Sequence, residues 1–421
     1  MKKILNNKTT RTNLVTYLVV IVAFILMQVA NSTGMLGSSM KGLLVPICVY
    51  ISLAVSLNLL VGICGELSLG HAGFMGIGAF SGIIIAALLK DSVANDFLRL
   101  LLAMLCGGVL AGIVGFLIGV PVLRLRGDYL AIVTLAFGEI MKNIIGNLYA
   151  GTDSEGFHIA VSTTKMKLAE DGKYIVSGPL GATGIQKLAT FTMGFLLVLF
   201  TLFVVQNLIN SKEGRAIKAV RDNRIAAESV GINVTAFRMK AFVVSAFLAG
   251  MAGALFGLNY SSVTAPKFNF NTSINILVFV VLGGMGNILG SVISAAVLYV
   301  LPEAMRGLQD YRMILYAIVL ILVMLATNSP AMRQLITRII IPQAVRVALP
   351  PLFNDVINLI KMTSLAFMLG VPDIMGAAKI EGAKTFRYFE IYAAVMLIYW
   401  VIIFLLGLVH KVLEKKCANM Y

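Results

Sequence analysis

Charged residues are scarce in this sequence: they make up 13% of its 421 residues, against 59% that are hydrophobic. A soluble globular chain has roughly 25% charged and 45–50% apolar residues. The shortage of charge therefore excludes an ordinary soluble domain and predicts an integral membrane protein. The net charge of +15 does not indicate nucleic-acid binding, because the Lys and Arg residues fall in short loops between apolar runs and form no basic patch interleaved with aromatics.

Cysteine and histidine are also few, with four and three residues. No two cysteines form a close pair, so neither a disulfide framework nor a metal site is predicted. The sequence has no GxxxxGK[ST] motif that would cradle nucleotide phosphates, and no paired carboxylates mid-span that would relay protons. Glu66 and Glu139 lie near span ends, where a solvated or loop-bonding role is the default. We therefore expect a non-catalytic chain that binds no cofactor: a channel, a carrier or a subunit driven from outside.

Long apolar runs are abundant. A transmembrane helix needs about 20 apolar residues. The candidate runs are 14–31, 42–63, 67–89, 98–123, 128–148, 190–209, 237–258, 274–301, 311–326, 354–372 and 388–409. They predict an all-α fold, a polytopic transmembrane helix bundle. The first run follows several basic residues and has no clear cleavage site, which predicts an uncleaved span with a cytoplasmic N-terminus.

The distribution of Lys and Arg orients these spans. Starting from the inside, the basic stretch 210–236 is cytoplasmic and the polar stretch 149–189 is external. The stretch 149–189 either caps the external face and meets a soluble partner, or is a passive connection. If the run 274–301 were one span, the later arginines would lie outside. If it forms a re-entrant hairpin broken at residues 283–286, they stay cytoplasmic, so we predict the hairpin. Such a break is tolerated only where it is buried or lines a cavity, so the hairpin is a candidate pathway element. A kinked single helix is the alternative.

The cytoplasmic segment 212–236 is basic and amphipathic, and its Ala226 and Ala227 are followed after three residues by Gly231. A short helix with small residues on one face, ended by glycine, suits docking into a groove of a cytoplasmic ATPase. An amphipathic helix that lies on anionic lipid is the alternative.

Five motifs occur in order along the chain: GELSLGHAGFMGIGAF (65–80), RLRGDYLAIVTLAFGEI (124–140), EGRAIKAVRDNRIAAESVGIN (213–233), AFLAGMAGALFG (246–257) and VLGGMGNILGS (281–291). With them, residues from about 40 to 326 resemble the permease subunits of branched-chain amino acid ABC importers, of the leucine–isoleucine–valine type with the longer N-terminus. The resemblance implies a second permease subunit (a heterodimer), two cytoplasmic ATPase subunits that bind ATP and Mg²⁺, and an extracytoplasmic amino-acid-binding protein. It also implies the bacterial cytoplasmic membrane.

The resemblance assigns candidate site residues. The segment from Arg215 to Gly231 matches the family's ATPase-docking segment, except that Arg224 stands where an acidic residue is usual. The predicted coupling residues are Arg215, Arg221, Asp222, Ala226, Ala227 and Gly231. The small or polar motif positions predicted to line the translocation pathway are Ser68, His71, Thr134, Asn275, Gly283, Gly284 and Asn287. Helix packing is the alternative explanation for each of the pathway positions.

The C-terminal sequence MRQLITRIIIPQAVRVALPPLFNDVINLIKMTSLAFMLGVPDI (332–374) carries a different pattern. Residues from about 331 to 416 resemble polar amino acid permeases of the histidine/glutamine/cystine type, which belong to another ABC importer class. Ile339 and Pro342 match the end of that class's docking motif, whose beginning would fall on residues 323–325 and is missing.

We therefore predict a branched-chain amino acid permease domain over 1–326 and a partial polar amino acid permease segment over 331–421, which returns the C-terminus to the cytoplasm. A natural fusion, a deletion between neighbouring genes and an assembly artefact all remain open for the junction. The predicted function is translocation of branched-chain amino acids, such as leucine, using ATP hydrolysed by partner subunits. The alternatives are a permease for polar amino acids, urea or short amides, and an ion-coupled secondary carrier.

Overall fold

The computed structural model describes residues 8–34, 37–125, 128–154, 156–161, 172–304 and 374–418. The chain divides into two compact units, unit 1 (Met1–Val323) and unit 2 (Met324–Tyr421). The predicted spans 311–326 and 354–372, the predicted junction and the partial docking motif at Ile339 and Pro342 lie outside the described residues.

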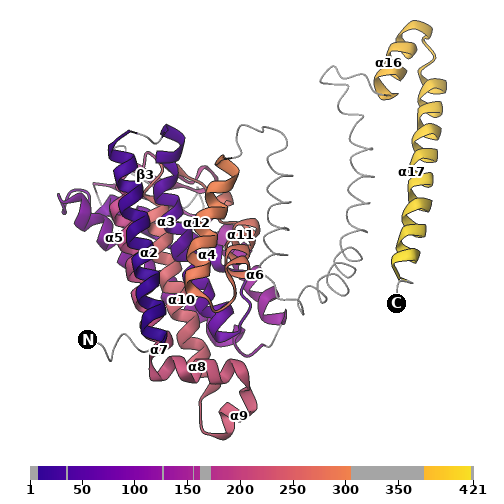
Figure 1. Ribbon diagram of the computed structural model, residues 1–421. Coiled ribbons are helices and arrows are strands. Elements are labelled where there is room, and N and C mark those ends of the chain that lie inside the picture. The colour runs from indigo at the N-terminus through magenta and orange to yellow at the C-terminus, as the bar shows by residue number, and fades with distance from the viewer. Residues whose placement is uncertain are drawn as a thin grey trace. The chain divides into compact units, whose positions relative to one another are not determined.

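Unit 1 is a helical bundle (Figure 1). Its membrane-length helices are α2 (Lys8–Ser32), α3 (Ser38–Asn58) with its π-helical continuation η1 (Leu59–Cys64), α4 (His71–Leu88), α5 (Asp96–Val122), α6 (Asp128–Gly146), α7 (Phe191–Asn210) and α10 (Val234–Gly257). Its shorter helices are α8 (Lys212–Asp222), α9 (Arg224–Ser229), η4 (Ala265–Phe268), α11 (Phe270–Gly283) and α12 (Ile288–Ala304). In the described residues of both units, eight helices are long and apolar enough to cross a membrane. The predicted polytopic all-α bundle is confirmed.

The core of unit 1 forms where α10 packs against α4 and α5. These contacts need the smallest side chains, because a Cβ on Gly78 of α4 would lie 2.0 Å from the carbonyl oxygen of Gly250 on α10. A Cβ on Gly253 would likewise lie 2.0 Å from the carbonyl oxygen of Met75. Close backbone approach at small residues is the usual way for helices to pack in a bilayer, where lipid is as apolar as the side chains.

The run 274–301 is broken into two helices, as the sequence predicts. α11 ends at Gly283 and α12 begins at Ile288, and the intervening Gly284 and Gly286 have φ values of +89° and +84°. The helices pack against each other, with Ser294 Oγ donating to the carbonyl oxygen of Phe279 at 2.5 Å. The alternative of one kinked helix is therefore wrong.

A small sheet lies in the polar connection that follows α6, and the sequence does not predict it. Its order is β2-β1-β3-β4-β5, and all pairs are antiparallel. The strands are β1 (Tyr149–Asp153), β2 (Gly156–Ala160), β3 (Lys173–Ser177), β4 (Ala182–Thr183) and β5 (Ser262–Val263). β5 follows α10, so the sheet joins two connections that are distant in the sequence. Within unit 1, the sheet and the α8–α9 segment lie at opposite ends of the bundle (Figure 1).

Unit 2 contains α16 (Ile374–Thr385) and α17 (Tyr388–Ala418) among its described residues. Its stretch Tyr388–Gly407 is long and apolar enough to span a membrane, in agreement with the predicted last span. The turn between the helices places Phe386 at φ +58°, a conformation that is unusual for a bulky residue.

Candidate functional site: the α8–α9 segment and the hairpin tip

Side-chain caps define the α8–α9 segment. Ser211 Oγ accepts from Gly214 N at 3.1 Å at the start of α8, and Asn223 Oδ1 accepts from Ala226 N at 3.0 Å at the start of α9. Asn233 does the same for α10, accepting from Ala236 N at 3.0 Å. Each cap satisfies one of the amide groups that a helix leaves unpaired in its first turn. The predicted single helix is thus two helices, because Asn223 ends one and begins the next.

The inner face of the segment packs against the neighbouring helices of unit 1. Ile217 and Val220 on α8 are buried, with exposed fractions of 1% and 5%. Ala227 on α9, which is 3% exposed, packs with Val220 and Val234 in a small core. A Cβ on Gly214 would lie 2.2 Å from the carbonyl oxygen of Leu208, so α8 begins directly against the end of α7. These contacts seat the segment on α7 and α10.

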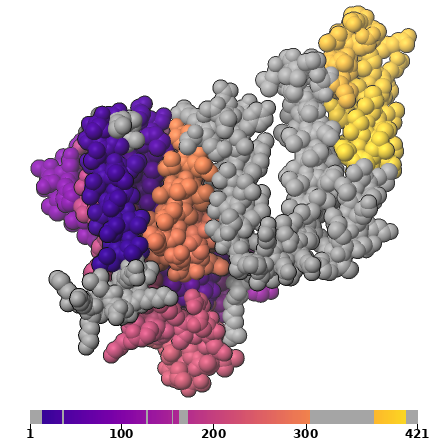
Figure 2. All heavy atoms as spheres, viewed as in Figure 1, coloured from indigo at the N-terminus to yellow at the C-terminus, as the bar shows by residue number. Residues whose placement is uncertain are grey.

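The outer face of the segment combines positive charge with exposed aliphatic side chains. Ile225 and Val230 are 79% and 74% exposed, and the side chain of Arg215 is exposed as well. The α8–α9 residues project at the lower end of unit 1 in Figure 2. A glycine in the left-handed conformation, Gly231 at φ +83°, ends the segment, and its N donates to Glu228 O at 3.0 Å.

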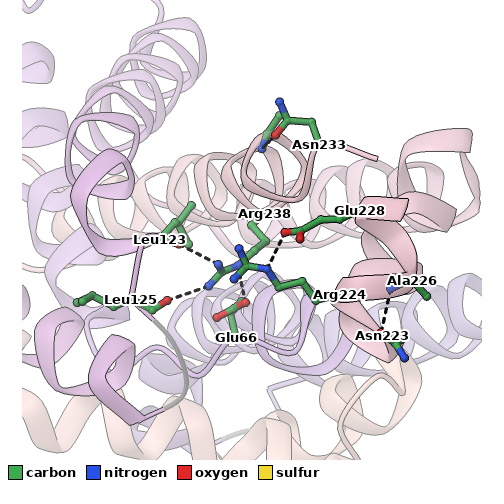
Figure 3. A network of polar contacts seen from close by, with 10 residues as sticks. Glu66, Leu123, Leu125, Asn223, Arg224, Ala226, Glu228, Asn233 and Arg238 are labelled. Atoms are coloured by element: carbon green, nitrogen blue, oxygen red, sulfur yellow. Dashed lines mark hydrogen bonds and ion pairs between the residues drawn. The ribbon is translucent and has the colours of Figure 1, made fainter. Parts of the chain in front are cut away.

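The predicted coupling residues do not share one face. Ala227 is buried, whereas Ala226 and Asp222 are exposed. Arg224, the departure from the family pattern, forms an ion pair with Glu228 one turn later, at 2.9 Å between Nε and Oε1 (Figure 3). This pair holds the arginine along α9.

Arg221 points back into unit 1 rather than only outward. Its Nη1 donates to the carbonyl oxygen of Gly62 at 2.9 Å, and its Nε and Nη2 donate to Asp222 Oδ1 at 2.9 and 2.8 Å. Gly62 lies in η1, near the end of a helix, where carbonyl groups lack intrahelical partners. Next to it, a Cβ on Gly65 would lie 2.7 Å from Cγ of Arg221. The arginine therefore caps the end of η1.

A buried ion pair stands beside this contact. Arg238 Nε lies 2.5 Å from Glu66 Oε1, and the two side chains are 4% and 17% exposed (Figure 3). Arg238 Nη1 and Nη2 donate to the carbonyl oxygens of Leu123 and Leu125 at 2.8 and 3.4 Å. The pair thus fastens α10 to the chain segments that follow η1 and α5. Glu66 has a loop-bonding role, and Arg238 is a residue that the sequence does not single out.

Three of the predicted pathway residues gather at the start of α4. Ser68 is buried, and its Oγ has no hydrogen-bond partner among the described residues. Thr134 Oγ1 accepts from Leu69 N at 3.0 Å, and His71 Nε2 lies 2.9 Å from Ser56 Oγ. The buried chain between η1 and α4 is held by these polar contacts.

The other four predicted pathway residues lie on the hairpin. Asn275 is exposed on α11, and Asn287 is exposed at the start of α12, where its Oδ1 accepts from Gly290 N at 3.1 Å. A Cβ on Gly290 would lie 1.8 Å from the carbonyl oxygen of Gly283, so the hairpin arms cross with their backbones in contact. A hydrogen bond connects the two regions, in which Ala72 N donates to Ser273 Oγ at 3.0 Å.

A cavity of about 570 Å³ lies elsewhere in unit 1, between α2, α3, α7 and α12. Its lining is apolar, and it includes Phe24, Cys48, Phe195 and Val297. None of the predicted pathway residues lines it. The polar groups described above therefore belong to a different part of the bundle.

The many apolar spans, the broken hairpin and the charged helical protrusion together define a multi-pass membrane protein of the permease type. Residues 39–324 match the family model described as the permease component of branched-chain amino acid transport systems. The chain belongs to this family.

Individual relatives support both predicted resemblances. The high-affinity branched-chain amino acid transport system permease protein LivM of Salmonella typhimurium is 35% identical over 290 residues, which cover 66% of each chain. The chain therefore matches just under two thirds of that relative's length. A C-terminal portion is 48% identical, over 95 residues, to the probable amino-acid ABC transporter permease protein PatM of Vibrio harveyi, which covers 23% of this chain and 41% of the relative.

The L-cystine transport system permease protein TcyB of Bacillus subtilis is 45% identical over 80 residues, 19% of this chain and 34% of the relative. No solved structure matches this chain.

Proposed function

We propose that this chain is the permease subunit of an ABC importer that moves branched-chain amino acids across the bacterial cytoplasmic membrane. The membership in the permease family and the similarity to LivM support this proposal. The structural observation that carries it is the α8–α9 segment, a capped pair of helices that projects from the membrane bundle and exposes Ile225 and Val230. A surface of this kind suits a protein partner better than water, because exposed aliphatic side chains gain free energy when they are buried.

The partner that fits this surface is an ATPase subunit. Because unit 1 shows no nucleotide-binding motif in its sequence, the energy for uphill transport has to come from outside. The segment would transmit force well, since its inner face is packed on α7 and α10 and each helix is capped. Its proposed coupling residues are Arg215, Arg221, Asp222, Ala226, Ala227 and Gly231. ATP and Mg²⁺ would bind to the partner subunits and not to this chain.

The proposal includes two further partners. A second permease subunit would complete the pathway as a heterodimer, and an extracytoplasmic binding protein would deliver the amino acid. The small sheet lies at the end of unit 1 opposite α8–α9, so it is the part of the described chain that would face the binding protein. With α8–α9 in the cytoplasm, the N-terminus and the C-terminus would both be cytoplasmic.

The proposed pathway uses helix ends rather than charged side chains. A zwitterionic amino acid with an aliphatic side chain needs apolar walls and a few dipoles for its ammonium and carboxylate groups. The hairpin provides helix ends at the Gly283–Asn287 break, where unpaired backbone groups carry partial charges. Ser68, His71, Thr134, Asn275, Gly284 and Asn287 are the proposed contributors of polar groups.

A second cargo class is supported by the C-terminal portion of the chain. Its relatives include permeases of amino-acid ABC transporters, and the name of one of them specifies L-cystine. A polar amino acid is therefore the second candidate. The two proposed domains, 1–326 and 331–421, would then derive from two importer classes.

The proposal is tested by uptake into proteoliposomes that contain the complete importer, with the binding protein outside. We expect leucine uptake that requires ATP. Uptake of cystine or histidine with no leucine uptake would support the second cargo. Leucine uptake that is driven by an ion gradient without ATP would overturn the proposal in favour of a secondary carrier.

A variant of the docking surface sharpens the test. Ile225→Glu places a charge at a 79% exposed position of α9 and is expected to abolish co-purification of the ATPase subunits. Leu180→Glu is the matched control, because Leu180 is 72% exposed and lies in η3 (Gly178–Leu180), within the small-sheet region. If both variants retain the ATPase subunits, α8–α9 is not the docking segment.

A further inference from the structure

One fully buried amide, that of Asn58 at the end of α3, fastens the tip of the broken hairpin. Asn58 Nδ2 donates to the carbonyl oxygen of Asn287 at 3.1 Å and to Ser291 Oγ at 2.8 Å. Its Oδ1 accepts from Gly286 N at 2.8 Å. Both ends of the amide are therefore used, and every partner belongs to the hairpin. A buried amide that is fully satisfied in one geometry holds its partners in that geometry.

The tip also contacts η1, where the backbone of Gly62 lies against the backbone of Gly286. A Cβ on Gly62 would lie 1.9 Å from Asn58 Oδ1 and 2.1 Å from Gly286 N. Gly62 and Gly286 are thus as close as two residues without side chains allow. The hairpin tip cannot shift toward η1, and η1 cannot shift toward the tip, without displacing the other.

Gly62 also contacts the α8–α9 segment. The carbonyl oxygen of Gly62 accepts the 2.9 Å hydrogen bond from Arg221 Nη1. Contacts therefore run without interruption from Arg221 on α8, through Gly62 in η1, to Gly286 and Asn58 at the hairpin tip. η1 is a π-helix, a form that often marks functional sites.

We propose that Asn58 and Gly62 are positioning residues that transmit a displacement of α8 to the hairpin tip, so that binding of an ATPase subunit changes the geometry at residues 284–287. This inference rests on the proposed role of α8–α9 as the docking segment. The tip contains Gly284 and Gly286 at positive φ, and glycine adopts positive and negative φ about equally readily, so a change of backbone geometry there costs little strain. The chain of contacts is short: the Arg221 guanidinium bonds to the Gly62 backbone, and beyond it the contacts are made by backbone atoms and the buried amide of Asn58.

The test compares transport with ATP hydrolysis in the reconstituted complete importer. Asn58→Leu keeps the volume of the side chain and removes all three hydrogen bonds to the hairpin. We expect the number of amino acids transported per ATP hydrolysed to fall at least about fivefold, the lower end of typical couplings between sites. ATP hydrolysis itself and co-purification of the ATPase subunits should persist. Thr201→Val is the matched control: Thr201 is equally buried, but among the described residues its Oγ1 bonds only to Leu197 O of its own helix.

A double-mutant cycle asks whether Asn58 and Arg221 act along one path. If they do, Arg221→Ala and Asn58→Leu together should lower the transport-to-ATP ratio no more than the stronger single variant. Additive effects would show independent roles and overturn the inference. An unchanged ratio in Asn58→Leu, in an importer whose wild type transports leucine with ATP, would also overturn it and leave the proposed function intact.

A spectroscopic measurement keeps the inference testable if Asn58→Leu fails to fold. A spin label on Met285→Cys, at a position that is 60% exposed on the hairpin tip, reports the local environment with Asn58 in place. The other cysteines are replaced by serine. Addition of the ATPase subunits should change the spectrum, and the change should be lost in Arg221→Ala protein that still co-purifies with the ATPase subunits. A spectrum that does not respond to bound ATPase subunits contradicts the inference.

Discussion

The guanidinium of Arg238 and the carboxylate of Glu66 form a buried pair, with 2.5 Å between Nε and Oε1. A charge at this depth is stable only when it is paired and its remaining donors are satisfied. Here the carbonyl oxygens of Leu123 and Leu125 accept from the two terminal nitrogens of the arginine. One side chain thus joins three segments of unit 1 that are far apart in the sequence.

Arg238→Met is expected to lower the free energy of unfolding by about 3 kcal/mol, because it leaves Glu66 largely buried without its partner. The double variant with Glu66→Gln should recover part of that loss. Thermal unfolding in detergent measures the change, with a thiol-reactive dye that reports exposure of the buried Cys48 and Cys64.

Lys240→Met serves as the control for this prediction. The Lys240–Glu213 ion pair has side chains that are 49% and 45% exposed, so its loss should change stability by no more than about 1 kcal/mol. If the two variants lose the same free energy of unfolding, the buried Arg238–Glu66 pair stabilises the fold no more than the exposed Lys240–Glu213 pair.

Asn223→Ala is expected to destabilise α9 locally. The variant removes the cap to Ala226 N, and the loss of such a cap costs about 1 kcal/mol. Because α9 has only six residues, the effect should appear as faster hydrogen exchange of the amides of residues 224–229. Asn95→Ala removes the equivalent cap of α5, so it should leave exchange in α9 unchanged. Unaltered exchange in Asn223→Ala would mean that packing alone maintains the helix.

Gly290→Ala is expected to prevent the hairpin from closing. The added Cβ would lie 1.8 Å from the carbonyl oxygen of Gly283, a rigid backbone atom. The yield of folded protein in size-exclusion chromatography should drop sharply. Gly42→Ala in α3 meets none of the described residues within 4 Å, so it should fold normally and gain about 0.5–1 kcal/mol from helix propensity. A folded Gly290→Ala protein with wild-type thermal stability would refute the close crossing.

Ser56→Ala is expected to destabilise the start of α4. Ser56 Oγ lies 2.9 Å from Leu53 O, to which it donates, and 2.9 Å from Nε2 of the buried His71. Loss of the hydroxyl removes this partner of the imidazole, and a buried polar group left unsatisfied costs about 1–3 kcal/mol. Ser52→Ala is the control, because its equally buried hydroxyl bonds, in the part of the chain that the structure describes, only to Cys48 O within the same helix. If thermal unfolding does not distinguish the two variants, His71 has found another partner.

The spans were predictable because the length and apolarity of a run are local properties. The run 42–63 appears as the continuous helix Ser38–Cys64, and the glycines at 283, 284 and 286 mark the break of the hairpin. The strands were not predictable in the same way. β4 and β5 have two residues each, and they exist only because the bundle brings the ends of α7 and α10 together.

The buried polar contacts could not be predicted from the sequence either. Asn58 stands in an apolar run, and its partners lie about 230 positions further along the chain, at a separation of 229 for the Asn287 carbonyl. Arg238 has the appearance of a basic residue at a span end. Arg221 was predicted as a coupling residue, but its contact with Gly62 required the structure. The roles of the predicted coupling and pathway residues stay predictions until the experiments above are done.

The small sheet has a mechanical consequence for the bundle. The chain before α7 and the chain after α10 are bonded to each other, with Leu188 N donating to Leu258 O and Ile185 N to Ser261 O, both at 3.1 Å. α7 and α10 are therefore clamped together at one end, and both carry the α8–α9 segment at the other. Because α8–α9 joins their other ends, the two helices are held together at both ends. A pull on α8–α9 would consequently tilt the two helices about the sheet, with the largest displacement on the side of Gly62.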